Sequence, residues 1–166
     1  MGTKSFKQCH ELGNLFEKAV KKYTKTFKSV SLNEDLNGTD LIRKNKYRYQ
    51  VKCDQTIPLY KNLYFEIFEK TPGYEAGKWR KSPMNADYYI LGYFVNIDKN
   101  HKPKNDHIVL YVVSMKELER IRNNYVMKVI KPTSKGFLIP VNQIKHKRFE
   151  FPKKKQKTKK KLKPLF

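Results

Sequence analysis

The sequence predicts a single α/β domain, or an α+β one, in which helices pack on a mixed β-sheet. Three observations favour this fold: an amphipathic helical pattern near the N-terminus, several aromatic and β-branched runs further on, and a helix-capping motif between the last two of these runs. A chain of 166 residues has the length of one ordinary domain, which can bury a core without disulfides or a structural metal.

The first predicted element is a helix within residues 6–27. Its apolar side chains recur at spacings of three and four residues, the period of an amphipathic helix. They are Cys9, Leu12, Phe16, Ala19, Val20, Tyr23 and Phe27. Glu17 follows Gly13 by four residues, so the two share a stripe beside the apolar face. The absent side chain at Gly13 predicts a close approach of the helix, and Glu17 is expected to border the sheet.

Two short strands are expected on either side of a loop at residues 44–46. The second strand alternates apolar with polar residues, which indicates one packed face and one polar face. If the loop is centred on Asn45, which tolerates the left-handed conformation, Asp40 faces Gln50. Lys52 then points to the same side as Gln50. A slip of one residue in the register would turn Asp40 onto the opposite face.

The rest of the domain is predicted as strands with a second helix between them. Ser114 and Glu117 have the spacing of a Ser-x-x-Glu capping box, which predicts that a helix starts at Ser114. Four runs are rich in aromatic and β-branched residues, as is typical of strands. They lie at residues 63–68, 88–97, 108–113 and 137–141.

The charge of the chain predicts a polyanionic partner. Lys and Arg number 37 against 15 Asp and Glu, a formal net charge of +22. Residues 145–166 carry +10 of this charge without apolar periodicity, so we expect a disordered basic tail after a domain at residues 1–144. The domain keeps +12 and is basic in its own right. The tail is expected to add sequence-independent affinity for phosphates, with a localisation or solubility role as the alternative. Its lysines expected to contact nucleic acid are Lys153, Lys154, Lys155, Lys157, Lys159, Lys160 and Lys161.

Among polyanions, DNA or RNA fits better than a membrane surface. No apolar run approaches the roughly 20 residues that span a bilayer, and no signal peptide is recognised, so we expect an intracellular, soluble protein. Cys9 and Cys53 form no CxxC pair, which argues against a zinc module and a disulfide scaffold. Both are expected to be reduced packing residues.

The order of these features resembles the PD-(D/E)XK nuclease superfamily. The resemblance is carried by a helix with Glu17, then Asp40, then residues 50–52 (Gln-Val-Lys) on the next strand, where Gln replaces the first acid of the E-x-K motif. Residues 13–17 are similar to the opening helix of Holliday-junction-resolvase-like and restriction-endonuclease-like members. Residues 62–66 and 86–90 resemble strands that follow the motif in some small phage-type nucleases.

This resemblance implies a single restriction-endonuclease-like domain with a central mixed β-sheet flanked by helices. It also implies magnesium-dependent hydrolysis of DNA, with Mn²⁺ as a substitute, and branched DNA or junctions are candidate substrates. The implied metal ligands are Asp40, Gln50, the Val51 carbonyl and Glu17. Lys52 is implied to stabilise negative charge on the phosphate. Many nucleases of this type act as homodimers, so a homodimer is a further expectation.

The Gln at position 50 is a departure from the family pattern. It removes one negative charge from the implied metal site, so either the affinity for metal falls or Glu17 and Glu66 become more important for metal binding. Glu66 is the one charge in the apolar run 63–68, which indicates either a paired or a functional carboxylate. The departure also fits a second hypothesis, a non-catalytic DNA- or RNA-binding protein.

Each candidate residue has a structural alternative. Asp40 follows a turn-forming segment and could cap that turn. Gln50 and Lys52 could be ordinary outward-facing strand residues.

A second basic segment combines the only Trp of the chain with three cations. Lys78, Trp79, Arg80 and Lys81 suit stacking on a base while holding phosphates. The alternative is a surface loop whose Trp folds back onto the core.

Overall fold

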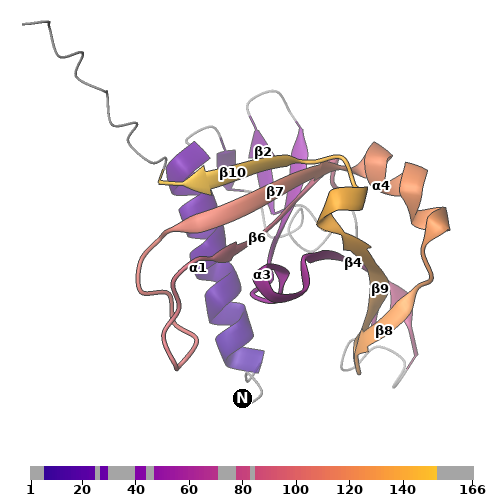
Figure 1. Ribbon diagram of the computed structural model, residues 1–166, viewed down its shortest axis with the longest axis horizontal. Helices are drawn as coiled ribbons and strands as arrows, with labels where there is room; N and C mark the ends of the chain where they lie inside the picture. Colours follow the sequence, from indigo (N-terminus) through magenta and orange to yellow (C-terminus); the bar gives the residue numbers. More distant parts are fainter. Residues whose placement is uncertain are drawn as a thin grey trace, which may run out of the picture.

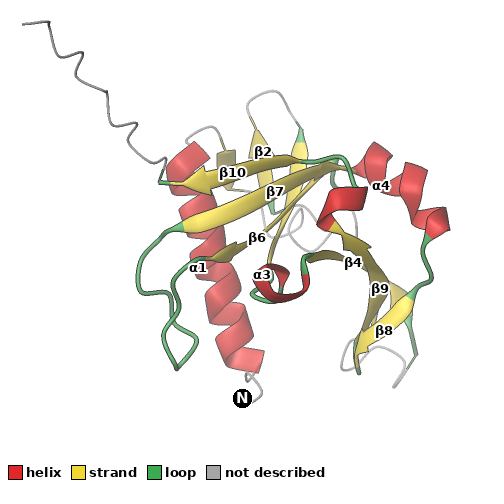
Figure 2. Cartoon of the chain, viewed as in Figure 1, coloured by secondary structure: helices red, strands yellow, loops and turns green. Residues whose placement is uncertain are grey.

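The computed structural model describes residues 6–24, 27–29, 40–43, 47–70, 78–82 and 85–152 (Figures 1 and 2). Its helices and strands are, in chain order, α1 (Phe6–Thr24), β1 (Phe27–Ser29), β2 (Leu41–Arg43), β3 (Arg48–Cys53), α3 (Ile57–Tyr60), β4 (Asn62–Glu69), β5 (Arg80–Lys81), β6 (Tyr88–Phe94), β7 (Ile108–Ser114), α4 (Met115–Ile121), β8 (Lys128–Lys131), β9 (Ser134–Pro140) and β10 (Lys147–Phe151). Short 3₁₀ turns lie at Arg122–Asn124 and Val141–Gln143. The fold is α/β, as predicted.

The strands form two sheets. The larger has six strands in the order β1-β2-β3-β6-β7-β10, and the smaller has four in the order β5-β4-β9-β8. β3 and β6 run parallel, while the other neighbours in the larger sheet are antiparallel, so this sheet is mixed as predicted. Figure 1 shows α1 on one side of the molecule and β4, β9 and β8 on the other.

One face of the larger sheet is covered by α1. Most of the predicted apolar stripe packs into a buried cluster with side chains of β2, β3, β6 and β7, but the helix ends at Thr24 and Phe27 belongs to β1. The buried residues of this cluster, called the α1 cluster below, are Leu12, Phe16, Ala19, Val20, Leu41, Tyr49, Ile90, Phe94, Ile108 and Leu110. Glu17 lies beside this stripe, with its side chain partly exposed.

The helix makes its close approach to the sheet at Gly92 and not at Gly13. A Cβ added at Gly92 would lie 2.2 Å from the Val109 carbonyl oxygen and 2.6 Å from Phe16 Cζ. A Cβ at Gly13 would meet nothing within 4 Å, so the close approach predicted there is wrong. The reason is that Phe16, a large residue of the helix, fills the space that Gly92 leaves on β6.

The opposite face of the larger sheet is covered by the smaller sheet together with α3 and α4. The expected mixed sheet flanked by helices is therefore met in part, because one face is covered by α1 and the other is shared between short helices and a second sheet. The buried residues of this second cluster are Ile57, Leu63, Phe65, Ile67, Tyr89, Leu91, Val109, Tyr111, Val113, Leu118, Ile121, Phe137, Ile139 and Ile144.

The second helix begins where the capping motif predicted. Ser114 Oγ accepts a hydrogen bond from the Glu117 N–H at 3.2 Å. The Glu117 carboxylate does not return to the cap; it accepts from Arg120 at 2.8 and 2.9 Å and from the Lys145 N–H at 3.1 Å. The bond from Arg120 is the main cause that lowers the pKa of Glu117 to about 2.

The expected tail does not begin at residue 145. Residues 147–151 form β10, which pairs antiparallel with β7 at the edge of the larger sheet. Phe149 and Phe151 alternate with Arg148 and Glu150, but the surrounding charges hid this short alternation in the sequence. Lys153, Lys154, Lys155, Lys157, Lys159, Lys160 and Lys161 lie outside the described residues.

The cysteines are both free, as expected, but only one takes part in packing. Cys53 is partly buried against the α1 cluster, while Cys9 is exposed on α1. Within the ranges that the structure describes, no helix is long and apolar enough to cross a bilayer.

The two glycines provide a matched stability test. Gly92→Ala is expected to lower the free energy of unfolding by about 3 kcal/mol, because the new methyl group meets a backbone oxygen that no rotamer change can relieve. Gly13→Ala is expected to raise it by roughly 0.5–1 kcal/mol, since alanine is the better residue inside an exposed stretch of helix. Urea denaturation of both variants checks this, and equal midpoints would contradict the packing described for α1.

Candidate metal centre

The β2–β3 hairpin has the register that the sequence predicts. Leu41 pairs with Tyr49 in an antiparallel ladder, as expected for a loop centred on Asn45. The loop at residues 44–46 lies outside the described residues. Asp40 comes immediately before β2, and its N–H donates to the Tyr49 carbonyl at 2.9 Å. The start of β2 therefore fixes Asp40 against β3.

The Asp40 side chain completes the end of this hairpin. Its Oδ2 accepts a hydrogen bond from the Val51 N–H, in the place where a backbone carbonyl would continue the ladder. Asp40 thus does cap local structure, because it accepts a backbone hydrogen bond from β3; the predicted turn that precedes Asp40 lies outside the described residues. The N–H and C=O of one residue in an extended strand point to the same side. The Val51 carbonyl oxygen therefore points to the side of β3 on which the Asp40 carboxylate lies.

Gln50 and Lys52 flank Val51 and point to the face opposite α1. This follows from the alternation along β3, since Tyr49 and Val51 belong to the α1 cluster. Lys52 is exposed, whereas Gln50 is only 8% exposed. Gln50 is therefore not an ordinary outward-facing strand residue, and the two side chains lie at the boundary between core and solvent.

Glu66 on β4 is a hydrogen-bonded carboxylate. Ser82 Oγ donates to its Oε1 at 3.2 Å, and Ser134 Oγ donates to its Oε2. The Tyr64 hydroxyl shares a 2.6 Å hydrogen bond with Ser134 Oγ. Both serines are buried, so Glu66 is held by neutral hydroxyl partners on the smaller sheet.

Tyr89 lies near both acids, and the sequence did not identify it. It is the partner of Gln50 across β3 and β6, and it is 2% exposed. Burial is the main cause that raises the pKa of the Tyr89 hydroxyl, and the negative charges of Glu66 and Asp40 raise it further. The hydroxyl is therefore neutral at physiological pH. The parallel pairing of β3 with β6, which places Tyr89 here, has no local signal in the sequence.

Glu17 is not brought into this group. Its carboxylate pairs with Lys21 Nζ at 2.8 Å along α1, and α1 packs on the face of the sheet opposite Gln50 and Lys52. The sequence predicted only that Glu17 borders the sheet, and its helix lies on the face opposite the two polar side chains of the hairpin. Helical periodicity placed Glu17 beside the apolar stripe but could not tell which face of the sheet the helix covers.

The oxygen atoms available at the hairpin suit a hard divalent cation. The described residues contain no group of three or more His, Cys, Asp or Glu arranged to hold a metal. What the hairpin offers is one carboxylate from Asp40, the Val51 carbonyl and the Gln50 amide oxygen. Magnesium is commonly held by one or two carboxylates and keeps several waters, so this donor set fits it.

The basic segment around Trp79 is built into the smaller sheet. Arg80 Nη2 donates to Glu69 Oε1 at 2.6 Å, so that guanidinium already holds a carboxylate. The Trp79 ring, partly buried, has Lys70 Nζ at 4.6 Å and Lys135 Nζ at 5.6 Å from its centroid. Lys78 and Lys81 are exposed. Lys70 and Lys135 add two cations that the sequence pattern did not reveal, because Lys70 follows β4 and Lys135 lies far along the chain on β9.

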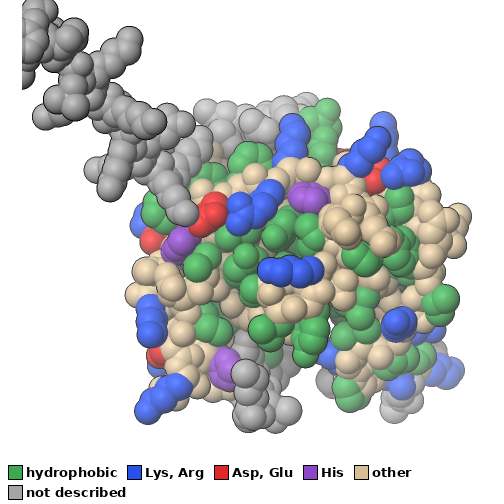
Figure 3. All heavy atoms as spheres, in the orientation of Figure 1, with side chains coloured by type: hydrophobic (Ala, Val, Ile, Leu, Met, Phe, Trp, Pro, Cys, Tyr) green, Lys and Arg blue, Asp and Glu red, His purple; other side chains and the backbone are tan. Residues whose placement is uncertain are grey.

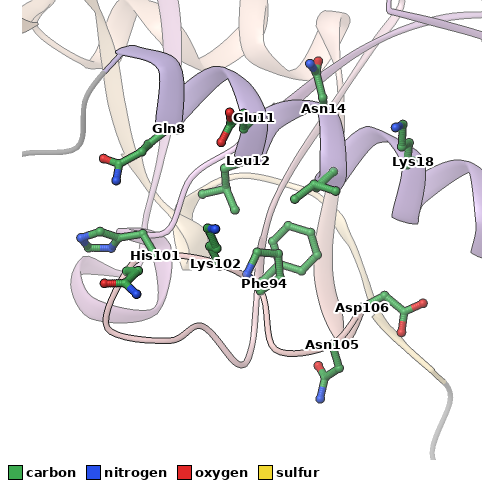
Figure 4. A pocket seen from close by; sticks show the side chains of 13 residues that line it. Gln8, Glu11, Leu12, Asn14, Lys18, Phe94, His101, Lys102, Asn105 and Asp106 are labelled. Atoms are coloured by element: carbon green, nitrogen blue, oxygen red, sulfur yellow. The ribbon is translucent and has the colours of Figure 1, made fainter.

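A cavity of about 660 Å³ lies elsewhere, between α1 and the loop after β6 (Figure 4). Leu12 and Phe94 point into it, and His101 and Lys102 face the helix from the loop. None of Asp40, Gln50 and Lys52 lines it. The cavity is therefore separate from the hairpin site.

The chain matches no protein-family model, and a search of curated proteins finds no similar sequence.

Metal binding is the direct test of the hairpin site. Asp40→Asn is expected to weaken Mn²⁺ binding at least about tenfold, because it removes the one charged ligand while an amide oxygen still accepts from Val51. Gln50→Glu is expected to tighten binding by about tenfold, since it adds a second carboxylate. Electron paramagnetic resonance of free Mn²⁺ during titration measures both.

Glu119→Gln provides the control, because Glu119 is an exposed acid on α4. Its affinity for Mn²⁺ should equal that of the wild type. An equal loss of affinity for Mn²⁺ in Asp40→Asn and Glu119→Gln would mean that Mn²⁺ is attracted by the overall charge and not bound at the hairpin.

Proposed function

We propose that this chain is a magnesium-dependent endonuclease of the PD-(D/E)XK type that hydrolyses DNA. The observation that carries the proposal is the Asp40 carboxylate bound at the Val51 N–H, between Gln50 and Lys52. The amide, carbonyl and ammonium groups belong to three consecutive residues of β3, and the acid is Asp40, which is hydrogen-bonded to that strand.

The order of elements supports the proposal. The resemblance implies an opening helix, then a hairpin that carries the acid on one strand and the Gln-x-Lys sequence on the next, within a mixed sheet. Here α1, β2 and β3 follow in that order, and β3 then pairs in parallel with β6. Glu17 on α1 is the member of the pattern with least support, because its carboxylate pairs with Lys21.

The residues divide the chemistry between them. Asp40, Gln50 and the Val51 carbonyl would hold the metal, and Mn²⁺ would substitute for Mg²⁺. A bound magnesium ion polarises the phosphate and lowers the pKa of the attacking water. Lys52, exposed beside these oxygens, places its ammonium against the phosphate and stabilises the negative charge that develops as the P–O ester bond breaks.

The electrostatic character of the surface supports a nucleic-acid substrate. The chain has a formal net charge of +22. Figure 3 shows Lys and Arg side chains both at the edge and over the middle of the visible face, and few Asp and Glu. Lys78 and Lys81 are exposed on the smaller sheet, with Lys70 and Lys135 at the Trp79 ring. These cations would hold the phosphate backbone outside the hairpin site.

Cleavage of supercoiled plasmid in the presence of Mg²⁺ tests the proposal. Lys52→Ala is expected to lower the rate at least about 100-fold, because it removes the cation that offsets the developing charge. Asp40→Asn is expected to lose cleavage to the same extent or more, and a chelator should abolish it in the wild type. Gel analysis of nicked and linear products measures the rates.

Lys116→Ala is the matched control for the loss of one positive charge, because Lys116 is exposed on α4. Its rate should stay within a factor of about two of the wild type. Cleavage that survives both hairpin substitutions would rule out the site assignment.

A non-catalytic DNA- or RNA-binding protein is the second candidate function. The observation that favours it is Gln50, which leaves the hairpin with a single carboxylate from Asp40 and no cluster of three acids among the described residues. Binding that is independent of magnesium and unaccompanied by cleavage would favour this candidate.

Both functions predict a strong salt dependence of binding, to which the basic tail contributes. Deletion of residues 153–166 removes eight lysines. The slope of log affinity against log salt concentration should flatten by about 0.9 for each phosphate that these lysines neutralise on duplex DNA. Fluorescence anisotropy at several salt concentrations measures the slope, and an unchanged slope would show that the tail does not contact phosphates.

A further inference from the structure

The short helix α3 exposes two large apolar side chains. Leu59 and Tyr60 are each 69% exposed, although they follow Ile57, which is 1% exposed. We call these two side chains the α3 knob. Exposing so much apolar surface is unfavourable in water, and contiguous exposed apolar side chains commonly mark a binding surface.

The α3 knob has a rigid base on the side of β3. Asp54 Oδ1 accepts from the Thr56 N–H at 2.8 Å and from Thr56 Oγ1 at 2.6 Å, which fixes the turn into the helix. Pro58 stands in the first turn, where its fixed φ angle suits a helix start. The Ile57 side chain packs into the core between the two sheets. The helix therefore has a defined position despite its four residues.

The other end of α3 is also fixed. The Lys61 N–H donates to the Ile57 carbonyl at 2.8 Å, and the Lys61 carbonyl accepts from the Val141 N–H at 2.9 Å. The Gln55 side-chain amide pairs with the backbone of Phe94 on β6. Its nitrogen donates to the Phe94 carbonyl at 3.1 Å, and its oxygen accepts from the Phe94 N–H at 2.8 Å. The backbone on both sides of the α3 knob is thus tied to the two sheets.

The α3 knob lies on the same face of the larger sheet as Gln50 and Lys52. Ile57 belongs to the cluster that contains Tyr89 and Leu91, which are the cross-strand partners of Gln50 and Lys52. Figure 1 shows α3 at the front of the molecule, and Figure 3 shows hydrophobic side chains gathered in the middle of that same face.

We propose that the α3 knob contacts the bases of DNA bound at the hairpin site and thereby selects DNA whose base stacking is already open, such as a fork or a branch. This inference rests on the proposed function for its substrate class. Leu59 and Tyr60 are assigned as specificity-determining residues, not as catalytic ones.

The charges around the α3 knob are complementary to DNA. Lys52 and Lys61 are exposed on either side of it in the chain, while the nearby Asp54 carboxylate already accepts two hydrogen bonds from Thr56. Cations that hold two phosphates would present the intervening bases to the apolar side chains.

The energetics favour open substrates. Inserting apolar side chains between stacked base pairs requires unstacking, which costs a few kcal/mol per step in an intact duplex. At a fork or branch that cost is smaller because the stack is already broken. Stacking on Tyr60 and contact with Leu59 then appear as a preference for open DNA over linear duplex.

A fluorescence experiment tests the inference in the presence of a chelator, so that it does not depend on cleavage. The probe is a forked duplex with 2-aminopurine at its first paired position, whose fluorescence changes when a base leaves its stack. Wild-type protein should change this fluorescence and bind the fork about tenfold more tightly than a linear duplex. The double variant Leu59→Ser with Tyr60→Ser should lose both effects and still bind linear duplex. Tyr60→Phe should retain both, because its ring is kept.

The matched control is Val126→Ser with Val129→Ser, which removes exposed apolar surface on and beside β8, where Val126 is 79% and Val129 is 61% exposed. These variants should behave as wild type. Wild-type cleavage with an unchanged fork preference in the double variant would overturn the inference and leave the nuclease proposal intact. A fluorescence change that needs the α3 knob, without any cleavage, would support the inference and count against the nuclease.

Sedimentation of the wild type and the double variant tests whether a second copy of the chain, and not DNA, covers the α3 knob. A dimer that dissociates in the double variant would mean that a second copy of the chain covers Leu59 and Tyr60, and would overturn the inference. A wild type that binds no DNA would overturn both proposals.

Discussion

The hydrogen bond from the Val51 N–H to the Asp40 carboxylate is the interaction on which the geometry of the hairpin site depends. Where a strand extends past the end of its neighbour, its backbone N–H has no partner in the sheet, and burying an unpaired N–H is unfavourable. The Asp40 carboxylate oxygen is the partner that accepts this hydrogen bond. The same bond therefore closes the hairpin and fixes a carboxylate next to the Val51 carbonyl.

The position of this carboxylate is coupled to the packing of the whole sheet. Leu41 and Tyr49 are buried beneath α1, so a slip of one residue in the register would turn one of these strands over and place its polar side chains against α1. The face on which Gln50 and Lys52 lie is thus determined by the helix on the other side. Gly92 lets that helix approach closely, which ties a stability feature on β6 to the geometry of the site.

Local pattern was sufficient for part of this structure. The helix period gave α1, the alternation and Asn45 gave the hairpin register, and the capping box gave the start of α4, because each is decided by neighbours within a few residues. The predicted start of the tail was wrong, because the edge strand β10 carries charges that are typical of a disordered segment.

The parts of the site that the sequence could not predict arise from distant pairings. Glu66 is bound by Ser134, which is 68 residues away, and Tyr89 reaches Gln50 through a parallel pairing of β3 with β6. The sequence also did not determine which face of the sheet α1 covers, and the observed packing places Glu17 on the face opposite Gln50 and Lys52. Choices of this kind depend on how whole elements pack, and a helical or strand period contains no information about them.

Anomalous diffraction from crystals grown with Mn²⁺ tests the central claim most directly. A peak is expected within coordination distance of the Asp40 carboxylate and the Val51 carbonyl oxygen, with the Gln50 amide oxygen turned toward it and Lys52 beside it. A peak at another group of residues, or none in crystals of protein that binds Mn²⁺ in solution, would contradict the assignment of the hairpin as a metal centre.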